Sequence, residues 1–429
     1  MDSPSPIFEE LQWRGQVHSA TEGFAAALAR GPLTVYNGFD PTGASLHVGH
    51  LIPILGLARL QRAGHTPIAL VGGGTGLIGD PSGKTRERQL LSRDVMEANV
   101  AQIRVQLAQY LDFEVSSNRA QLRNNLDWLE PLSLLEFMRD TGKHFTVNYM
   151  LAKDSVKSRI QSEEGISLTE FVYMPLQAYD FLWLNENANC QAQLGGSDQW
   201  GNIVAGVDLI RRKRGSAAYG LVYPLLTTAS GAKFGKSEGG AIWLDAELTS
   251  PYRFYQYWFN CADEDVVAYL KTFTWLARAE IHALDQERQD NPGARVAQRT
   301  LAREVTRLVH GESELTKAER ATQVLFGGDL AEISLAEWSE IGEDVPYSER
   351  PAAELQGDGA ELVTLLAESG LAQSRGEARR LIRGGGVYLN HRRVTDEGSR
   401  IRQSDCLHGQ FLLLRVGRRK LHLLRLLPA

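Results

Sequence analysis

The first half of the chain alternates between short apolar runs and longer segments with a helical spacing of apolar residues. Residues 33–36 and 67–71 are short and apolar, as expected of buried strands. Residues 50–63 carry the apolar spacing of a helix, which should stop at Gly64. A strand, a helix and a second strand in this order predict a parallel sheet covered by helices. We therefore predict that residues 1–228 form an α/β domain.

The remainder of the chain divides into four shorter regions. Residues 229–245 are rich in glycine and are predicted to form a mobile loop, and residues 246–326 have a helical pattern. Residues 327–358 contain Gly, Glu, Asp and Pro with little periodicity, which predicts a linker. Residues 359–429 contain both helical and strand-like segments, so we expect a small, separate α+β module.

The composition is that of an ordinary soluble globular protein. Of 429 residues, 43% are hydrophobic and 23% are charged, which excludes collagen-like and disordered classes. No run of about 18 apolar residues is present, so no membrane association is expected. The first ten residues are typical neither of a secretory signal nor of a transit peptide. Three scattered cysteines (Cys190, Cys261 and Cys406) predict a reducing, cytoplasmic compartment without a disulfide framework.

Charge is distributed unevenly along the chain. The net charge of -6 would by itself argue against a nucleic-acid partner, but residues 362–429 hold 13 Lys and Arg against 5 Asp and Glu, a net +8, which leaves -14 elsewhere. A capping pattern at Ser374 and Glu377 predicts a helix in this module. The candidate RNA-binding side chains are Arg375, Arg379, Arg380, Arg383, Arg392 and Arg393. Although an arginine stripe is usually a solvated face, the charge contrast favours a phosphate-backbone partner, and few exposed aromatic residues favour structured RNA.

A glycine cluster after the second predicted strand is the first phosphate-binding candidate. Residues 74–79 fit the G-x-G-x-x-G pattern, but no strand-end acid follows about 20 residues later, which disfavours a dinucleotide site. Two near matches to the P-loop also fail, because Ile78 and Ser230 stand where that motif needs glycine.

His47, Gly49 and His50 are a stronger candidate, because they stand at the start of the first predicted helix. Helix N-termini attract anions through their free N–H groups, two imidazoles could donate to phosphate oxygens, and Gly49 would let a ligand approach the backbone. A zinc site is the first alternative, although no third ligand stands nearby in the sequence. A plain helix cap is the second. Of these hypotheses for His47, Gly49 and His50, we favour nucleotide binding.

Lys233 and Lys236 lie on the glycine-rich loop. A flexible loop with two lysines suits a group that closes on a developing negative charge and then opens. The alternative is a solvated surface loop, which is where lysine pairs usually occur.

A polar stripe marks a later helix, which Ser167 and Glu170 open with a capping-box pattern. Tyr173, Gln177 and Asp180 follow at spacings of four and three, so they share one face of an otherwise apolar helix. A lined pocket is as plausible here as a solvent-facing stripe. We expect Pro175 to bend this helix in its interior and to leave the carbonyl of Phe171 unpaired. Residues 191–199 should form a strand, a glycine turn and a helix start.

Several of these motifs resemble those of one enzyme family in the same order. Residues 36–50, 69–84, 233–237 (K-F-G-K-S) and 249–252 are similar to signatures of the bacterial-type tyrosyl-tRNA synthetases, which are class I aminoacyl-tRNA synthetases. The tail resembles an S4-type RNA-binding module. The resemblance implies a Rossmann-like catalytic domain over 1–228, an α-helical anticodon-binding domain over 246–326 and an S4-like domain over 359–429. Pro53 and Pro175 are the small departures from the pattern.

The resemblance also implies a role for each candidate residue. The residues implied in tyrosine binding are Tyr36 and Asp180 at the phenolic hydroxyl, Asp80, Tyr173 and Gln177 at the ammonium group, and Gln193 near the carboxylate. Those implied in ATP binding are Gly38, Asp40, Thr42, His47, Gly49, His50, Gly195, Asp198, Lys233 and Lys236. Those implied in catalysis are His47, His50, Gln199, Lys233 and Lys236.

The resemblance further implies L-tyrosine, ATP and tRNA(Tyr) as reaction partners, and a homodimer. Mg²⁺ is expected to be carried by the ATP phosphates rather than by a protein metal site. A tryptophanyl-tRNA synthetase, a non-catalytic RNA-binding relative and a small nucleotidyltransferase are the competing hypotheses.

Overall fold

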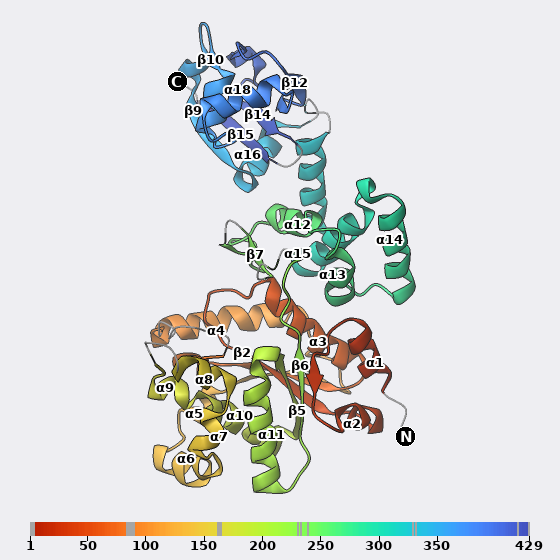
Figure 1. Cartoon of the computed structure of the whole chain (residues 1–429), viewed down its shortest axis with the longest axis vertical. Coiled ribbons are helices and arrows are strands. Elements are labelled where there is room, and N and C mark those ends of the chain that lie inside the picture. The colour runs from red at the N-terminus through yellow and green to blue at the C-terminus, as the bar shows by residue number, and fades with distance from the viewer. Residues whose placement is uncertain are drawn as a thin grey trace. The chain divides into compact units, whose positions relative to one another are not determined.

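The computed structural model describes residues 5–82, 91–160, 165–229, 231, 234–237, 240–327, 330, 333–417 and 420–427 (Figure 1). They fall into two compact units. The first comprises residues 1–248 and 259–305, and the second comprises residues 249–258 and 306–429. The helices of the described ranges include none with the length and apolar character needed to cross a membrane.

The first unit is built on a six-stranded sheet with the strand order β1-β6-β5-β2-β3-β4. The strands are β1 (Ser19–Ala20), β2 (Thr34–Phe39), β3 (Thr66–Val71), β4 (Gln121–Asn124), β5 (Cys190–Gly196) and β6 (Tyr219–Tyr223). Only β1 pairs antiparallel; the β6–β5, β5–β2, β2–β3 and β3–β4 pairs are parallel. The sheet also includes a reversal of strand order between β5 and β2, where α/β proteins bind their ligands.

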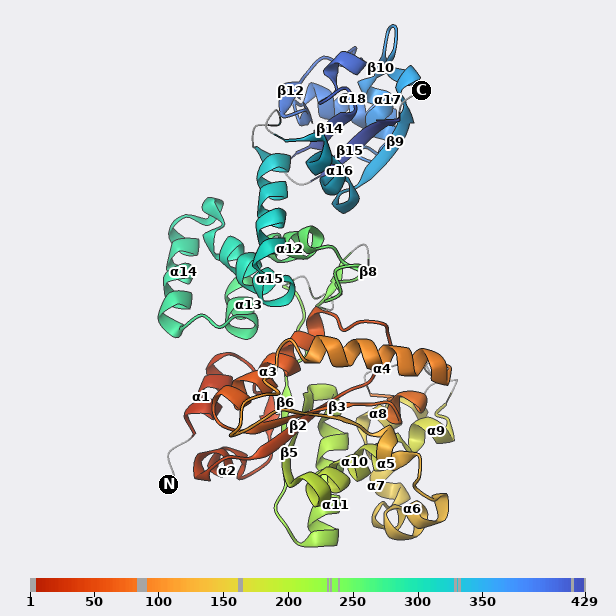
Figure 2. The ribbon, with the colours of Figure 1, turned by 180° about the vertical axis from the view of Figure 1, so that it is seen from behind.

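Helices cover both faces of this sheet. The helices of the first unit are α1 (Pro6–Trp13), α2 (Phe24–Arg30), α3 (Leu51–Arg62), α4 (Arg93–Leu107), α5 (Leu126–Leu129), α6 (Leu134–Asp140), α7 (Val147–Leu151), α8 (Asp154–Ile160), α9 (Leu168–Phe171), α10 (Tyr173–Ala188), α11 (Trp200–Arg214), α13 (Val266–Phe273) and α14 (Arg278–Asp290). Figure 2 shows α3 and α4 on one face and α10 and α11 on the other. A short hairpin, β7 (Lys236–Ser237) and β8 (Gly240–Ala241), completes the unit.

The predicted α/β fold is confirmed. The strands expected at 33–36 and 67–71 are β2 and β3, and the helix expected at 50–63 is α3, which follows a single 3-10 turn at Val48–His50. Buried side chains follow one another almost without interruption along β2 and β3, because both faces of a parallel sheet are covered.

The helix is interrupted at Val172, three residues before Pro175, so a disruption lies where the proline predicted one, but Pro175 does not lie in a helix interior. The Ser167 hydroxyl accepts from the Glu170 N–H at 3.2 Å, as the capping pattern predicted, but α9 ends after one turn. Val172, with φ -86° and ψ -1°, separates it from α10. Pro175 is therefore the third residue of α10, in the first turn, where a backbone N–H has no helical acceptor to lose.

The second unit contains two helices before its C-terminal sheet. α12 (Pro251–Phe259) lies almost wholly within it, and α15 (Val296–Phe326) contributes residues to both units. The helical path of α15 is interrupted at Gly311, whose φ of 84° lies in the left-handed region that glycine tolerates. Within the second unit, the Phe254 ring of α12 packs edge-to-face on His310 at a centroid distance of 4.7 Å.

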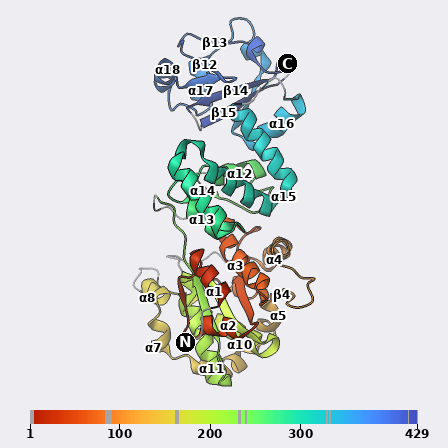
Figure 3. The same cartoon turned by 90° about the vertical axis from the view of Figure 1, so that its right-hand side faces the viewer.

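The C-terminal module is a five-stranded sheet with two helices packed on it (Figure 3). Its elements are α16 (Leu335–Asp344), β9 (Tyr347–Pro351), β10 (Ala360–Glu361), α17 (Leu362–Glu368), α18 (Arg375–Arg383), β11 (Val387–Leu389), β12 (Arg392–Val394), β13 (Arg400–Ile401), β14 (Phe411–Val416) and β15 (Lys420–Leu427). Leucines of α17 and β14 form its buried core with Ile382 of α18. The cap at Ser374, which accepts from the Glu377 N–H at 3.2 Å, is where the sequence predicted it.

Residues 327–358 differ from the irregular linker that their pattern predicted. They contain α16 and β9, and β9 pairs in parallel with β15 at the edge of the C-terminal sheet. The Trp338 ring of α16 is fully buried and stacks on Phe411 at 6.0 Å. Periodicity could not reveal β9, because an edge strand of five residues alternates between exposed and half-buried positions and has no apolar run. The domain boundaries themselves stay predictions.

Candidate active site

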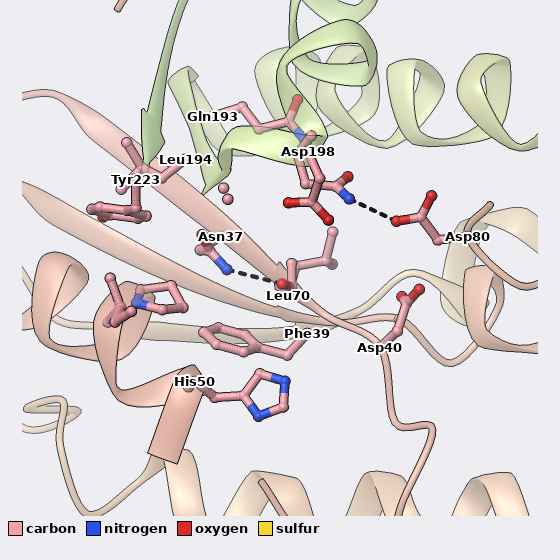
Figure 4. A pocket seen from close by; sticks show the side chains of 18 of the residues that line it. Asn37, Phe39, Asp40, His50, Leu70, Asp80, Gln193, Leu194, Asp198 and Tyr223 are labelled. Atoms are coloured by element: carbon pink, nitrogen blue, oxygen red, sulfur yellow. Dashed lines mark hydrogen bonds between the residues drawn. The ribbon is translucent and has the colours of Figure 1, made fainter. Parts of the chain in front are cut away.

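A cavity of about 560 Å³ opens at the carboxyl ends of β2, β3 and β5, where the strand order reverses. Figure 4 shows Asp40 and Asp80 along one side of it, with His50 and Phe39 below and Gln193 and Asp198 above. The candidate residues that line it are Tyr36, Gly38, Asp40, Thr42, His47, Gly49, His50, Asp80, Tyr173, Gln177, Asp180, Gln193, Gly195, Asp198 and Gln199. Lys233 and the side chain of Lys236 lie outside the described residues.

Tyr36 and Gln193 supply polar groups deep in the cavity. They are register partners on the adjacent parallel strands β2 and β5, so their side chains lie on the same face. The Tyr36 hydroxyl and the Gln193 Oε1 are both buried without a hydrogen-bond partner among the described residues. Burial and the nearby Asp180 carboxylate raise the pKa of Tyr36 well above its usual value, so its hydroxyl stays protonated and able to donate. Such unsatisfied buried groups are costly unless a ligand completes them.

Asp180 is a buried carboxylate held by two neutral donors. It projects from α10, is 2% exposed, and accepts from Asn125 Nδ2 at 2.8 Å and from Trp128 Nε1 at 2.7 Å. The Trp128 ring stacks on Trp183 of α10 at 4.1 Å, which fixes the indole N–H. Burial raises the pKa of Asp180 to about 7, although both hydrogen bonds act in the opposite direction. Sequence reasoning missed Asn125 and Trp128, because they are more than 50 residues away from Asp180 in the chain.

A second carboxylate, Asp40, lies at the end of β2 and is held by two hydroxyl groups. The Tyr173 hydroxyl donates to Oδ2 and the Thr75 hydroxyl to Oδ1, both at 2.9 Å. A Cβ at Gly72 would collide with this Asp40 oxygen and with Thr75. Gly72, just before the predicted glycine cluster of residues 74–79, is therefore needed for the close approach of these side chains.

The third carboxylate, Asp80, belongs to a network that crosses from the β3 loop to α11. Gln199 Nε2 donates to its Oδ2 at 2.7 Å, and the Ser82 N–H donates to its Oδ1 at 2.9 Å. The Asn202 amide then lies within hydrogen-bond distance of both Gln177 Oε1, at 3.0 Å, and Gln199 Oε1, at 3.2 Å. Asn202 thus orients two predicted ligand-binding amides, and nothing in its sequence context indicated this.

The two histidines form a reciprocal cap before α3. The Gly49 N–H donates to His47 Nδ1 at 3.0 Å, and the His47 N–H donates to His50 Nδ1 at 3.1 Å. The alternative of a helix cap is therefore real, but it does not displace a role in ligand binding, since both residues line the cavity. A neutral imidazole that accepts at Nδ1 carries its proton on Nε2. A Cβ at Gly49 would lie 2.7 Å from His47 Cε1, so glycine is needed for this cap.

Among the described residues there is no group of three or more His, Cys, Asp or Glu side chains arranged to hold a metal ion. Asp40 and Asp80 both use their two carboxylate oxygens in the hydrogen bonds given above. These carboxylates therefore serve as acceptors that organise the cavity.

The six candidate arginines of the C-terminal module are exposed but are not equivalent. Arg383 is bound to Glu397 at 2.7 Å, and Arg393 Nε donates to the Gly385 carbonyl at 2.7 Å. The guanidinium groups of Arg375, Arg379, Arg380 and Arg392 have no hydrogen-bond or ion-pair partner among the described residues. These four are the cations best placed to meet a phosphate.

Comparison with known families agrees with the fold. The family model described as tRNA synthetases class I (W and Y) matches residues 28–327, and the Tyrosine--tRNA ligase SYY-like C-terminal domain matches residues 340–424. The chain belongs to the class I tRNA synthetases of the tryptophan and tyrosine group, and is therefore an aminoacyl-tRNA synthetase. The resemblance drawn from the motifs is thereby confirmed.

Its relatives point to one of the two amino acids. A Roseiflexus castenholzii protein named Tyrosine--tRNA ligase is 57% identical over 420 residues, which cover 98% of this chain and 99% of that one. A Geobacillus stearothermophilus protein of the same name is 51% identical over 422 residues, with 98% and 99% covered. Among solved structures, a C-terminally truncated mitochondrial tyrosyl-tRNA synthetase from Coccidioides posadasii is similar with a TM-score of 0.65 and 35% identity, covering 73% of this chain and 91% of that chain.

The raised pKa of Asp180 predicts how stability depends on pH. The pKa is about 7 in the folded chain against an ordinary value of 3.8, so this carboxyl group stabilises the fold fully below about pH 4, and the stabilisation is lost as the pH rises through 7. In Asp180→Asn that dependence is removed. From pH 5 to pH 8, the free energy of unfolding of the wild type should fall relative to the variant by on the order of 2 kcal/mol.

Denaturant unfolding at a series of pH values measures this difference. Asp127→Asn, which alters an exposed aspartate on α5, is the matched control and should keep a constant difference from the wild type. A constant difference for Asp180→Asn as well would show that Asp180 titrates normally in the fold.

Proposed function

We propose that the chain is a tyrosine–tRNA ligase, which activates L-tyrosine with ATP and transfers it to the 3′ end of tRNA(Tyr). The observation that carries this proposal is the pair of groups at the buried end of the cavity, the Asp180 carboxylate and the unpartnered Tyr36 hydroxyl. A phenolic hydroxyl can donate to Asp180 and accept from Tyr36 at once. An indole N–H can only donate, so tryptophan would leave the Tyr36 hydroxyl unsatisfied.

The activation step needs positioned groups rather than a protein nucleophile. The tyrosine carboxylate attacks the α-phosphorus of ATP, an oxygen–phosphorus bond forms, and the bond to pyrophosphate breaks. A terminal ribose hydroxyl of tRNA then attacks the activated carbonyl, and AMP leaves. Catalysis is therefore expected from orientation and from stabilisation of the charge that spreads over the phosphates.

The amino-acid end of the substrate matches the acidic side of the cavity. The ammonium group of tyrosine would meet Asp80, the Tyr173 hydroxyl and Gln177, which the network through Gln199 and Asn202 holds in place. Gln193 would lie near the substrate carboxylate and the adenylate, to which only its amide N–H groups can donate.

The nucleotide end matches the residues around the start of α3. The proposed ATP-binding residues are Gly38, Asp40, Thr42, His47, Gly49, His50, Gly195 and Asp198, with Lys233 and Lys236 at the departing pyrophosphate. Because Nδ1 of both histidines is used in the cap, Nε2–H is the group each would offer to phosphate. Mg²⁺ would enter on the ATP phosphates and neutralise part of their charge, since Asp40 and Asp80 already bind protein donors.

ATP–pyrophosphate exchange tests the activity and the amino acid together. Exchange should occur with L-tyrosine and stay at background with tryptophan, with phenylalanine or without an amino acid. Phenylalanine lacks the hydroxyl, which leaves the buried Tyr36 hydroxyl without a partner at a cost of about 1–3 kcal/mol and deprives Asp180 of the donor that tyrosine would add. Exchange with tryptophan, or none with tyrosine, would overturn the proposal.

We also propose that the C-terminal module binds tRNA through Arg375, Arg379, Arg380 and Arg392. Deleting residues 328–429 should leave tyrosine-dependent exchange within about twofold of the full chain and lower the rate of tRNA charging at least about tenfold, because phosphate contacts are lost. The deletion starts before β9, because β9 pairs with β15 and a shorter deletion would leave β9 without that partner strand.

Replacing these four arginines by alanine in the full chain is the companion variant for the deletion. It should lower the rate of tRNA charging and leave tyrosine-dependent exchange unchanged. Loss of exchange in either variant would place part of the active site in the C-terminal module, against the proposal.

We propose further that the chain is a homodimer that uses the surface of α6 to α9. Large apolar side chains are exposed on these helices: Leu134, Leu135, Met138, Val147, Leu151, Ile160 and Leu168. Leu134, Leu135 and Leu168 are more than 70% exposed. A concentration of apolar surface of this kind is typical of a protein–protein interface.

Leu135→Glu tests the interface, because a charge buried without a partner disfavours association. Sedimentation velocity should find a dimer for the wild type and a shift towards monomer for this variant. Val105→Glu, on the exposed side of α4 at 63% exposure, is the control and should remain dimeric. A monomeric wild type would contradict the proposal.

A further inference from the structure

Phe234, the second residue of the K-F-G-K-S motif, is held by an aromatic pair outside the cavity. Its side chain is 5% exposed. Its ring stacks on Phe273 with a centroid distance of 5.2 Å and an interplanar angle of 13°, and it lies tilted against Tyr269, also at 5.2 Å. Phe273 and Tyr269 are four residues apart on α13, so they present one face to Phe234. The Phe234 N–H also donates to the Leu226 carbonyl at 3.3 Å.

The chain that follows Phe234 is bound directly to the histidine motif. The Ile242 N–H donates to the Gly235 carbonyl at 3.1 Å, and the Val48 N–H donates to the Ile242 carbonyl at 2.9 Å. The Leu244 N–H donates to the Leu46 carbonyl at 2.8 Å. The lysine motif and the histidine motif are thus joined by backbone hydrogen bonds.

α13 is in turn attached to α3, the helix that the histidine motif begins. Arg59 of α3 is 4% exposed and donates to the carbonyls of Thr272 and Thr274, each at 2.9 Å. Arg14, which directly follows α1, donates to the carbonyls of Lys271 and Thr274 at 2.8 and 3.1 Å. Cations at the carbonyl end of a helix are favourable, because that end carries the negative part of the helix dipole.

These contacts close a ring. It runs from the histidine motif along α3 to Arg59, from Arg59 to the end of α13, from Phe273 to Phe234, and from Gly235 back to Val48. Phe273 and Tyr269 do not line the cavity, whereas Phe234 does. They can therefore affect the reaction only indirectly, either through the position of Phe234 and of the residues next to it or through the attachment of α13 to α3.

We propose that Phe273 and Tyr269 are positioning residues for tyrosine activation. By holding Phe234, they set where the lysine motif stands relative to His47 and His50. The inference rests on the proposed function, in which Lys233, the neighbour of Phe234 in the chain, stabilises the departing pyrophosphate. A displacement of such a group by about 1 Å is enough to lower a rate by about 100-fold.

Phe273→Leu is the primary test, because it keeps an apolar side chain but removes the stacked ring. In tyrosine-dependent pyrophosphate exchange, kcat should fall about 10- to 100-fold, while the Kd for tyrosine, measured without ATP, stays within about twofold. Tyr269→Leu should have the same pattern with a smaller loss of kcat. The wild-type chain, assayed in parallel, shows whether the proposed activity itself is present.

Phe24→Leu is the matched control for stability. Phe24 is fully buried in α2, where its ring contacts Phe8 and Tyr219, away from the cavity residues. The two Phe→Leu variants should lose similar free energy of unfolding, but kcat should stay near the wild-type value in Phe24→Leu. Equal losses of kcat in both variants would mean that Phe273 has only a general structural role.

A double-mutant cycle with Phe234→Leu decides whether the effect passes through Phe234. If it does, adding Phe273→Leu to Phe234→Leu should change kcat by less than about twofold, because the contact is already gone. Multiplying losses, or a parallel loss of tyrosine affinity, would overturn the inference. If Phe273→Leu does not fold, the same cycle with Tyr269→Leu gives the same decision.

Discussion

The chemistry of the cavity depends on one buried carboxylate that has neutral partners. Asp180 accepts from Asn125 and Trp128, and neither partner supplies a positive charge. A cation here would form an ion pair with the carboxylate, and a ligand hydroxyl would then gain little by donating to it. Two neutral donors instead stabilise the buried carboxylate in part, and its pKa stays raised. A ligand hydroxyl that donates to Asp180 therefore gains more than it would from an exposed carboxylate.

The position of that carboxylate follows from the order of the strands. Because β3 and β4 continue the sheet on one side of β2, and β5 and β6 continue it on the other, the loops after β2 and β5 turn away from each other and leave a crevice. Tyr36 and Gln193 lie on the two strands that border it. α10 brings Asp180 to the same place. Fold and substrate recognition thus have the same geometrical origin.

Much of this could be predicted from local sequence, and the part that could not is long-range. The pattern of apolar residues over 33–71 predicted β2, α3 and β3. The spacing of Tyr173, Gln177 and Asp180 predicted that they share one face of α10. The partners of those residues come from distant segments, as Trp128 and Asn202 do, and no local pattern reveals such a pairing. The edge strand β9 was missed for a related reason, since its register depends on β15.

The cavity also explains how an acidic catalytic region can handle a polyanionic substrate. Asp40, Asp80 and Asp180 each accept hydrogen bonds on both carboxylate oxygens from hydroxyl, amide, indole or backbone donors, which offset their negative charge within the cavity. At the start of α3 the backbone N–H groups of His47, Val48 and Gly49 are bonded within the protein, and the two imidazoles are the donors that suit phosphate. Net charge summed over a region says little about such a site, because the sign that a ligand meets is decided within a few ångströms. The same holds at larger scale for the C-terminal module, whose net +8 is concentrated in a part of the chain that the overall value of -6 conceals.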